Sequence, residues 1–458
     1  MDADVVVVGA GLAGLAAARA LVEAGLEPLV VEARDRVGGR TLNEPLDAEQ
    51  VVEVGGQWVG PTQRRLLELA RELGVGTFPT WGEGDNLVRW RNVLKTYTGT
   101  IPKVSPVALA DFGQAQLRLD RLARRVPLEA PWVAPRAERL DGQTFASWMA
   151  RNTATPAARM MLQTMLEAVW AADPRDVSLL HVLFYIHSAG GLDALLDTEG
   201  GAQAERFVGG SQRLSLELAA RLGDERLVLG APVREVEHDE DGVTVRWRGG
   251  EARARRAIIT LPPALAGRLA YAPALPAVRD GLTQRMAQGS VIKCMAVYDE
   301  PFWRAEGLSG QALDPAGQVK IVYDNSPPSG RPGVLLGFLE GRGARRLAAA
   351  TQDERRAVVL DGFARLFGPR ARTAERYIDK AWMDEEFSRG CYGGYLPPGG
   401  WTDFGRALRA PIGPLHWAGA ETATVWNGYM DGAVTSGERA AREAVTALAR
   451  LAVSPRTG

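Results

Sequence analysis

The stretch VVVVGAGLAGLAAARAL, residues 5–21, decides the fold. Its four successive valines predict a strand that is buried on both faces of a parallel sheet. The glycines that follow have the spacing GxGxxG, and the alanine-rich residues after them favour a helix. In such a turn Gly9 permits the tight bend, Gly11 lets a pyrophosphate approach the backbone, and Gly14 lets helix and strand pack closely. The stretch therefore predicts a dinucleotide-binding strand–turn–helix.

A second strand and an acidic residue complete this unit. Pro28–Val31 is apolar and ends directly before Glu32, which lies 18 residues beyond Gly14. An acidic side chain at that distance can accept hydrogen bonds from both ribose hydroxyls, and it would repel a 2′-phosphate. The residues therefore predict a site for NAD or FAD rather than NADP. They do not distinguish NAD from FAD.

The composition is that of an ordinary globular protein. The chain has 458 residues, 46% of them hydrophobic, and a net charge of −1, which gives no case for binding nucleic acid. Two cysteines cannot form a disulfide framework, and four histidines show no metal-ligand spacing. There is no basic leader before Val5, and no apolar run approaches the roughly 20 residues that span a bilayer. We expect a cytoplasmic protein without a metal site or membrane contact.

The residues after the acid favour FAD. EARDRVGGR, residues 32–40, resembles the extended fingerprint of the FAD-binding amine oxidase superfamily, E-A-R-x-R-x-G-G-R. Arg36 and Arg40 can offer forked donors to phosphates, whereas Arg34 could equally be a solvated surface charge. GGQWVG, residues 55–60, resembles the next flavin-lining turn of that superfamily. The resemblance implies FAD contacts from Gly9, Gly11, Gly14, Glu32, Arg34, Gly39, Arg40, Gly56 and Gln57.

A second strand–turn–helix near the C-terminus predicts a second anion site. His416–Gly419 has strand character and precedes the glycine-containing Asn427–Ala433 and a helix-forming run. In the flavoproteins that this chain resembles, such a helix directs its positive end at the flavin ring and stabilises the charge formed on reduction. A packing helix with a glycine-rich entry is the alternative. The resemblance implies flavin contacts from Gly419, Glu421 and Met430, and from Val233 in an earlier strand.

Strand and helix patterns return along the chain in a way that predicts two interleaved domains. Val243–Trp247 alternates with a period of two and predicts a strand, whereas the pattern of residues 81–205 is mainly helical. We expect a mixed α/β fold with α+β character, in which a Rossmann-like FAD-binding domain is interleaved with a substrate-binding domain of mixed sheet and helices. The expected ranges are 1–80, 206–284 and 411–450 for the FAD-binding domain, and 81–205 and 285–410 for the substrate-binding domain.

One segment narrows the resemblance to the flavin monoamine oxidase family. GCYGGYLPPG, residues 390–399, is similar to the pattern G-C-Y-x-x-Y-F-P-P-G, with Leu396 as the one departure. The similarity runs from about residue 4 to 445 and lacks the C-terminal membrane anchor of the mitochondrial members. It implies that Cys391 bonds covalently to the flavin 8α-carbon and that Trp382 packs on the flavin. A buried, unreactive thiol is the alternative for Cys391.

Three further residues match catalytic positions of that family. Tyr392 and Tyr429 match two tyrosines that face each other in front of the flavin and align the amine. Lys293 matches a lysine that holds a water against flavin N5, where a cation also assists reoxidation by O2. Without the resemblance, the tyrosines would be assigned to core packing, and Lys293 to the surface of an edge strand.

The same resemblance predicts an apolar substrate cavity. Gln203 would orient the amine by a polar contact, and Leu196 falls near the gate between the entrance and the substrate cavities. The other residues expected to line the substrate cavity are Val169, Trp170, Ile321, Tyr323 and Phe338. The lining positions that can be aligned carry no charge, whereas a diamine needs a buried carboxylate and an amino acid needs an arginine.

The chain therefore resembles an FAD-dependent amine oxidase. We expect it to convert apolar primary amines, aromatic or alkyl, with O2 into aldehyde, ammonia and H2O2. No side-chain general base is evident in the sequence. A putrescine or polyamine oxidase is the alternative enzyme, and a flavin-binding protein without turnover is an alternative from another class. The expected partners are a small amine and O2, and the resemblance suggests a homodimer.

Overall fold

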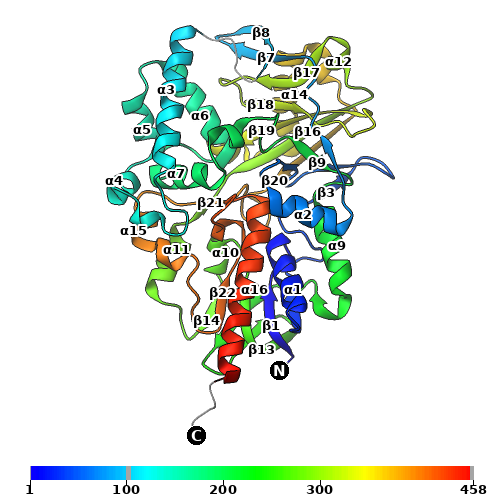
Figure 1. Ribbon diagram of the computed structural model, residues 1–458. Coiled ribbons are helices and arrows are strands. Elements are labelled where there is room, and N and C mark those ends of the chain that lie inside the picture. The colour runs from blue at the N-terminus through cyan, green and yellow to red at the C-terminus, as the bar shows by residue number, and fades with distance from the viewer. Residues whose placement is uncertain (1, 100–104, 454–458) are drawn as a thin grey trace.

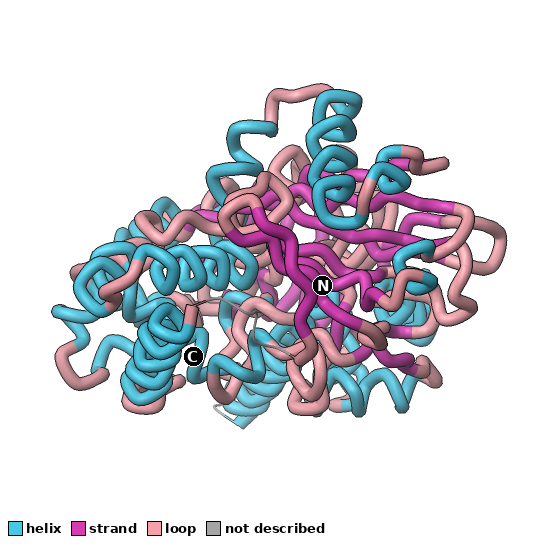
Figure 2. Tube along the Cα trace, turned by 90° about the horizontal axis from the view of Figure 1, so that it is seen from above, coloured by secondary structure: helices cyan, strands magenta, loops and turns pink. Residues whose placement is uncertain are grey.

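The computed structural model describes residues 2–99 and 105–453, which form a mixed α/β structure around two large sheets (Figure 1). One sheet lies at the end of the molecule that contains β1 and α16, and the other lies at the opposite end, beside a group of helices. Seen from above, a large group of helices lies to the left of the strands, and further helices lie above and below them (Figure 2). The mixed α/β class expected from the sequence is confirmed.

Within the described residues, the first sheet has eight strands in the order β10-β2-β1-β13-β12-β11-β14, and β22 also pairs with β13. β1 lies inside the sheet and runs parallel to β2 and β13. Val5, Val6 and Val7 are fully buried because both faces of the sheet are covered, which is why the strand needs an unbroken apolar run. The strands are β1 (Ala3–Val8), β2 (Pro28–Val31), β10 (Leu227–Val228), β11 (Val233–His238), β12 (Val243–Trp247), β13 (Gly250–Ile259), β14 (Ala270–Ala272) and β22 (Leu415–Trp417).

Two helices from opposite ends of the chain pack together beside this sheet (Figure 1). α1 starts at Leu12, directly after the glycine turn, and α16 starts at Met430. They approach so closely that a Cβ on Gly437 would collide with the carbonyl oxygen of Ala13. The contact brings both helix N-termini to the same end of the sheet. The helices of this part are α1 (Leu12–Glu23), α2 (Arg64–Leu73), α9 (Gln212–Leu222), α10 (Pro263–Ala266), α11 (Ala277–Arg285) and α16 (Met430–Val453).

The second sheet has seven strands among the described residues, in the order β20-β16-β19-β18-β17-β7-β8. β16 pairs antiparallel with both β19 and β20, so it is an interior strand, and all eight of its residues are buried. The bounds are β7 (Asp85–Trp90), β8 (Val93–Tyr97), β16 (Val291–Tyr298), β17 (Leu308–Leu313), β18 (Ile321–Asp324), β19 (Gly333–Glu340) and β20 (Arg376–Ala381).

The hairpin β7–β8 departs from the mainly helical pattern expected for residues 81–205. Arg91 and Asn92 join the two strands, and both have positive φ, 49° and 64°. A two-residue turn with this geometry matches the twist of the paired strands, and asparagine tolerates it well. The remaining part of the range is helical: α3 (Pro106–Ala123), α4 (Ala137–Asp141), α5 (Phe145–Asn152), α6 (Pro156–Trp170), α7 (Leu179–Ser188) and α8 (Leu192–Leu196).

Short elements connect the two large sheets and cover their edges. Three small sheets pair β3 with β4, β15 with β21, and β9 with β5 and β6. Their strands are β3 (Asn43–Pro45), β4 (Val51–Glu53), β5 (Trp58–Val59), β6 (Thr77–Pro79), β9 (Glu205–Phe207), β15 (Ala287–Gln288) and β21 (Gly394–Tyr395). The other helices are α12 (Phe302–Ala305), α13 (Gly341–Leu347), α14 (Gln352–Phe367) and α15 (Gly400–Phe404).

The strands of the first sheet fall within residues 1–80, 206–284 and 411–450, and those of the second within 81–205 and 285–410. The domain boundaries themselves stay a prediction. Across residues 2–99 and 105–453, none of the helices has the length and apolarity needed to cross a membrane. The same residues contain no group of three or more His, Cys, Asp or Glu that could hold a metal ion.

Candidate functional site

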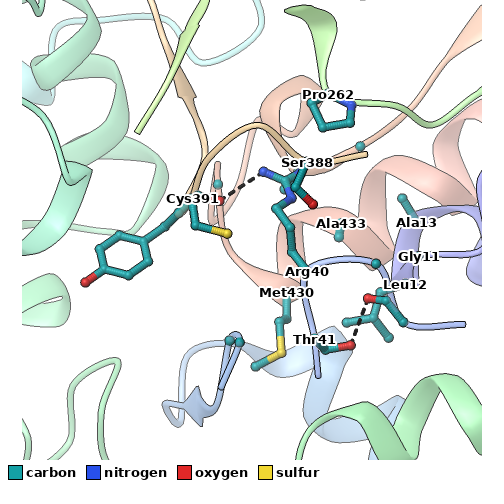
Figure 3. Close-up of a pocket in the computed structure, with 18 of the residues that line it drawn as sticks. Gly11, Leu12, Ala13, Arg40, Thr41, Pro262, Ser388, Cys391, Met430 and Ala433 are labelled. Carbon is teal, nitrogen blue, oxygen red and sulfur yellow. Dashed lines mark hydrogen bonds between the residues drawn. The ribbon is translucent and has the colours of Figure 1, made fainter. Parts of the chain in front are cut away.

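A cavity of about 580 Å³ extends from the glycine turn of the first sheet to the wall formed by the second sheet. Gly9 and Gly11 line one part of it, and Lys293 on β16 and Phe338 on β19 line another. Figure 3 shows Arg40, Cys391 and Met430, which come from three distant segments, gathered around this space. A cavity that joins a nucleotide-binding turn to an apolar chamber suits a large cofactor and a small substrate together.

The nucleotide end of the cavity has the features needed to hold a pyrophosphate and a ribose. Leu12 and Ala13, the first residues of α1, line it, and no side chain caps the helix N-terminus. These free N–H groups and the positive end of the helix dipole favour an anion. One oxygen of Glu32 accepts a hydrogen bond from the backbone N–H of Ala10 at 2.7 Å. Val233, the first residue of β11, also lines the cavity, and its contact with the cofactor stays a prediction.

Gly14 acts beneath the turn rather than in the cavity. It does not belong to the lining, and a Cβ at this position would collide with the carbonyl oxygen of Gly9. This is the close helix–strand approach that the glycine spacing predicted. Gly14 therefore shapes the site for a dinucleotide without contacting it.

The arginines of residues 34–40 have separate tasks. Arg34 lines the cavity and donates to the Ser388 hydroxyl at 2.9 Å and to Glu385 at 3.2 Å, so it is not a solvated surface charge. Arg36 does not reach the cavity. Its guanidinium donates to the carbonyl oxygens of Val37 and Gly39, at 3.2 and 3.1 Å. The expectation that Arg36 faces a phosphate is therefore wrong, because this side chain braces its own loop.

Arg40 and Glu421 form a buried, forked ion pair with N–O distances of 2.5 and 2.9 Å. Glu421 is only 1% exposed and does not line the cavity, whereas Arg40 does. Burial opposes ionisation of Glu421, yet the Arg40 guanidinium keeps the pKa of this carboxyl below its ordinary value. Arg40 also donates to the backbone oxygen of Tyr392 at 2.9 Å. Glu421 therefore positions Arg40, and through it the 391–392 segment, rather than reaching the cofactor space expected for it.

Cys391 lines the cavity, while Trp382 supports it from behind. Burial raises the pKa of the Cys391 thiol to about 12, and the nearby Arg40 guanidinium lowers it. Trp382 is 1% exposed, packs in the same apolar cluster as Cys391, and donates its indole N–H to the carbonyl oxygen of Val54 at 2.8 Å. It does not line the cavity in this structure. The packing of Trp382 on a flavin stays a prediction.

Lys293 is buried and belongs to an interior strand, so the edge-strand alternative is wrong. Its ammonium donates to the carbonyl oxygen of Gly55 at 2.9 Å and to the side-chain oxygen of Gln57. Gln57 in turn donates to Asn325 at 2.8 Å. Burial lowers the pKa of Lys293 to about 7, against the attraction of Glu53. The chain thus holds a titratable cation in the cavity wall beside the predicted flavin-lining turn.

Tyr392 and Tyr429 both line the cavity, and each makes its aromatic contacts with different neighbours. The Tyr392 ring lies edge-on to Phe338 with 6.1 Å between the ring centroids. The Tyr429 ring lies 4.8 Å from Trp426 and 6.0 Å from Tyr185. Both phenols have raised pKa values because of burial, so they remain neutral hydrogen-bonding groups at physiological pH.

The expected substrate-side residues mostly line the cavity. Gln203 donates to the carbonyl oxygen of Leu195 at 3.3 Å, and its buried side-chain oxygen has no hydrogen-bond partner among the described residues. Trp170 does not line the cavity but packs behind Tyr185, with 4.7 Å between the ring centroids. Its predicted lining role is therefore wrong for this structure. The lining includes Val169, Leu196, Gln203, Ile321, Tyr323 and Phe338, and on the cofactor side Gly39, Gly56, Gln57, Gly419 and Met430.

Among the charged residues of the lining that sequence reasoning missed, Glu340 lies beside the expected substrate residues. It lines the cavity, is 6% exposed, and accepts a hydrogen bond from the Tyr392 hydroxyl at 2.9 Å. The expectation of an uncharged lining is therefore incomplete. The sequence did contain a signal for Glu340. It lies two residues after the predicted lining residue Phe338 on β19, and side chains two residues apart share a face of a strand.

Comparisons with known proteins agree with this site. The family described as flavin containing amine oxidoreductase matches residues 12–445. A Mycobacterium tuberculosis protein named as a flavin-containing monoamine oxidase is 45% identical over 445 residues, covering 97% of each chain. Amine oxidase B of Sus scrofa is 37% identical over 454 residues, covering 98% of this chain and 87% of that one.

Solved structures of two amine oxidases have the same fold. Putrescine oxidase bound to putrescine superimposes with a TM-score of 0.93 at 36% identity, covering 97% of this chain and 99% of that one. Cyclohexylamine oxidase from Brevibacterium oxydans has a TM-score of 0.94 at 34% identity, covering 98% and 100%. Since the family match extends over nearly the whole chain, and the relatives retain well over 30% identity at that coverage, this protein belongs to the flavin containing amine oxidoreductase family and is an amine oxidase.

Proposed function

We propose that the protein oxidises apolar primary amines, aromatic or alkyl, to aldehyde, ammonia and H2O2, with O2 as the electron acceptor and FAD as the cofactor. The observation that carries this proposal is one continuous cavity that joins the dinucleotide turn to an apolar chamber lined by Tyr392, Tyr429 and Lys293. When bound, FAD would take up the hydride equivalent that leaves the amine α-carbon, after which water hydrolyses the imine.

The residues present fit FAD along the whole cavity. Free N–H groups at the start of α1 would hold the pyrophosphate, and Glu32 would accept from the ribose. Met430 at the N-terminus of α16 lies near Gly56, where a Cβ would come within 3.7 Å of the Met430 sulfur. We further propose that Cys391 bonds covalently to the flavin.

The chain's own side chains would bind and align the amine. The Tyr392 and Tyr429 rings offer aromatic faces for its nitrogen and α-carbon. The unpartnered oxygen of Gln203 offers an acceptor for an amine N–H. Ile321 and Phe338 add apolar surface and exclude water. Lys293 would hold a water molecule beside Gly55 and Gln57, whose oxygens it already contacts.

Putrescine oxidation is the second candidate, and Glu340 is the observation that favours it. A diamine carries a second cation, which needs a buried carboxylate, and Glu340 supplies one inside the cavity. The fold is also shared with a putrescine oxidase. The apolar residues that make up most of the substrate-side lining support monoamines as the first candidate.

Product formation with a panel of amines tests both candidates. We expect the purified holoenzyme to release H2O2 and aldehyde with benzylamine and butylamine, and kcat/KM for butylamine to exceed that for putrescine. A reversed preference would support the diamine candidate. Flavin-loaded protein that releases no H2O2 with any amine would contradict turnover and support a flavin-binding protein without activity.

A further inference from the structure

Glu340 presents a partly unused carboxylate to the substrate cavity. It is the last residue of β19 and is more than nine-tenths buried, yet it belongs to the cavity lining. One oxygen accepts a hydrogen bond from the Tyr392 hydroxyl at 2.9 Å. Within residues 2–99 and 105–453, the second oxygen has no hydrogen-bond partner. A buried carboxylate with an open oxygen needs a partner that arrives from the cavity.

The charges around Glu340 leave a negative excess. Lys320, directly before β18, attracts the Glu340 carboxylate, but its ammonium is already paired with Glu167 of α6. Tyr323 of β18 and Tyr392 face the same region as neutral phenols. In the strand register of β16 and β19, Lys293 lies opposite Phe338, and Glu340 lies opposite Val291. The Lys293 ammonium is bound to oxygens of Gly55 and Gln57. Glu340 and Glu167 therefore share Lys320, and Lys293 is held by Gly55 and Gln57, so the described residues give Glu340 no ion-pair partner of its own, which favours a cationic ligand.

We propose that the Glu340 carboxylate receives the ammonium group of the incoming amine and accepts one of its protons, so that the amine reaches Tyr392 and Tyr429 in neutral form. This proposal deepens the proposed function and rests on it. In this step one N–H bond breaks and one O–H bond forms, so that the opposite charges of the ammonium and the carboxylate cancel. No electrons are transferred, and no additional reagent is needed.

The need for such a group follows from the chemistry of amines. A primary alkylamine is a cation at neutral pH, and an ammonium without a partner is costly to bring into an apolar cavity. Loss of hydride from the α-carbon requires the nitrogen lone pair, which the ammonium lacks. Burial raises the pKa of Glu340 to about 7, while the Tyr392 hydroxyl and Lys320 lower it, so this carboxyl can exchange a proton near neutral pH.

The pH dependence of flavin reduction tests the proposal. We would measure kcat/KM for benzylamine with the holoenzyme and follow flavin reduction anaerobically between pH 5.5 and 10. For the native enzyme, kcat/KM plotted against pH should have a bell shape. It should fall below pH about 7 as Glu340 is protonated, and fall again above the amine pKa. In Glu340→Gln, which can use only neutral amine, the acidic limb should move from about pH 7 up to the amine pKa. About two pH units below the amine pKa only about 1% of the amine is neutral, so the variant should be about 100-fold slower there and recover near that pKa.

Matched variants separate proton acceptance from support of Tyr392. Glu340→Gln keeps an oxygen that can accept from the Tyr392 hydroxyl, whereas Glu340→Leu removes both the charge and that acceptor. Tyr392→Phe keeps the carboxylate but removes a hydrogen bond that lowers its pKa, so its acidic limb should move to higher pH. The flavin spectrum and the melting temperature of each holoenzyme show that the variant is folded and loaded. Binding of benzyl alcohol, a neutral analogue, should change less than twofold in Glu340→Gln.

Three results would overturn the proposal. The first is a Glu340→Gln profile that keeps the acidic limb of the native enzyme. The second is a defect with putrescine but none with benzylamine, which would make Glu340 an anchor for a second ammonium. The third is a defect in Glu340→Leu alone, which would make Glu340 only a support for Tyr392. A native holoenzyme that no amine reduces would instead contradict the proposed function itself.

Discussion

Lys293 illustrates how a single buried residue can connect the cofactor and the substrate parts of the cavity. Its ammonium is held by oxygens of Gly55 and Gln57, which precede β5, while its backbone belongs to β16. Cys391, Arg40 and Glu340 are likewise side chains whose environment, rather than their chemical type alone, decides what they do.

We expect Lys293→Met to slow reoxidation of the reduced flavin by O2 about 100-fold, because a cation near the site stabilises developing negative charge. Reduction by the amine should change much less. Since burial lowers the pKa of Lys293 to about 7, the native reoxidation rate should fall as pH rises through 7 and the lysine loses its charge. Stopped-flow mixing of reduced enzyme with O2 across this range measures both effects. Lys95→Met, on the exposed face of β8, is the control and should match the native enzyme. Unchanged O2 kinetics in Lys293→Met would contradict the role.

Cys391 lines the cavity, and its proposed bond to the flavin has a direct chemical readout. After acid precipitation, the native protein should keep its yellow colour in the pellet, and the peptide containing Cys391 should carry the mass of the flavin. Cys391→Ala should release the yellow colour to the supernatant, whereas Cys294→Ala, which alters a buried thiol outside the cavity, should not. Colour in the supernatant of the native protein would make Cys391 a packing residue.

Glu421→Gln should destabilise the fold by about 3 kcal/mol, because it leaves the Arg40 guanidinium, whose side chain is only 21% exposed, beside a neutral partner. The matched control is Glu44→Gln, which breaks an ion pair with Arg376 on the surface, where both side chains are about 40% exposed. That loss should stay below about 1 kcal/mol. Urea unfolding of the two variants and the native protein measures the difference. Equal midpoints for both variants would show that the buried pair contributes no more than the exposed one.

At the scale of elements, α1 and α16 show how tightly this fold depends on small residues. α1 contacts β1 and the glycine turn on one side and α16 on the other, so bulk is excluded at Gly14 and at Gly437. Small residues let the two helix N-termini converge on the cavity, and this convergence places Leu12 and Met430 in its lining. The close packing of these two helices therefore also sets the shape of the cavity.

Gly14→Ala should destabilise the protein by about 2 kcal/mol or more and weaken FAD retention, because its Cβ would overlap the Gly9 carbonyl oxygen. Gly113→Ala, inside α3, is the control. A Cβ there meets nothing within 4 Å, and the change should stabilise that helix by up to about 1 kcal/mol. Thermal melts and flavin content after gel filtration measure both effects. A native-like Gly14→Ala variant would show that helix and turn can move apart at little cost.

At the scale of the whole molecule, buried contacts join the small sheets that contain β4 and β9 to the segment after β18 of the second large sheet. Arg206 of β9 forms an ion pair with Glu53 at 2.7 Å and donates to the backbone oxygens of Asn325 and Ser326, which follow β18. Gln57 contacts Asn325 as well. Since these contacts are buried and the chain passes repeatedly between the sheets, we expect the two predicted domains to act as one folding unit.

Calorimetry of the holoenzyme should therefore show a single unfolding transition, and added FAD should raise its midpoint in a flavin-free preparation by mass action. Arg206→Met should lower the midpoint and could separate the transition into two, since it removes one buried link between the sheets. Two transitions in the native protein, with only one sensitive to FAD, would show that the predicted domains fold independently.

Sequence alone was most informative where neighbouring residues in the chain perform the function together. The turn Gly9–Gly14, the acid Glu32 and the Cys391–Tyr392 segment each lie within a short stretch, so their spacing can be compared with a known pattern. Strand β12 has the same bounds as the alternating pattern that predicted it. The hairpin β7–β8 escaped because its signal is a turn of two residues inside a long helical region.

The tertiary structure decided which side chains face the cavity. The sequence by itself determined the dinucleotide turn, the mixed α/β class and the family, because these depend on local spacing and on hydrophobic pattern. Only the folded chain shows that Arg36, Trp170 and Trp382 point elsewhere and that Glu340 meets the Tyr392 hydroxyl 52 residues away. The physical reason is that contacts between distant segments depend on strand register and helix packing, which no local stretch of sequence specifies.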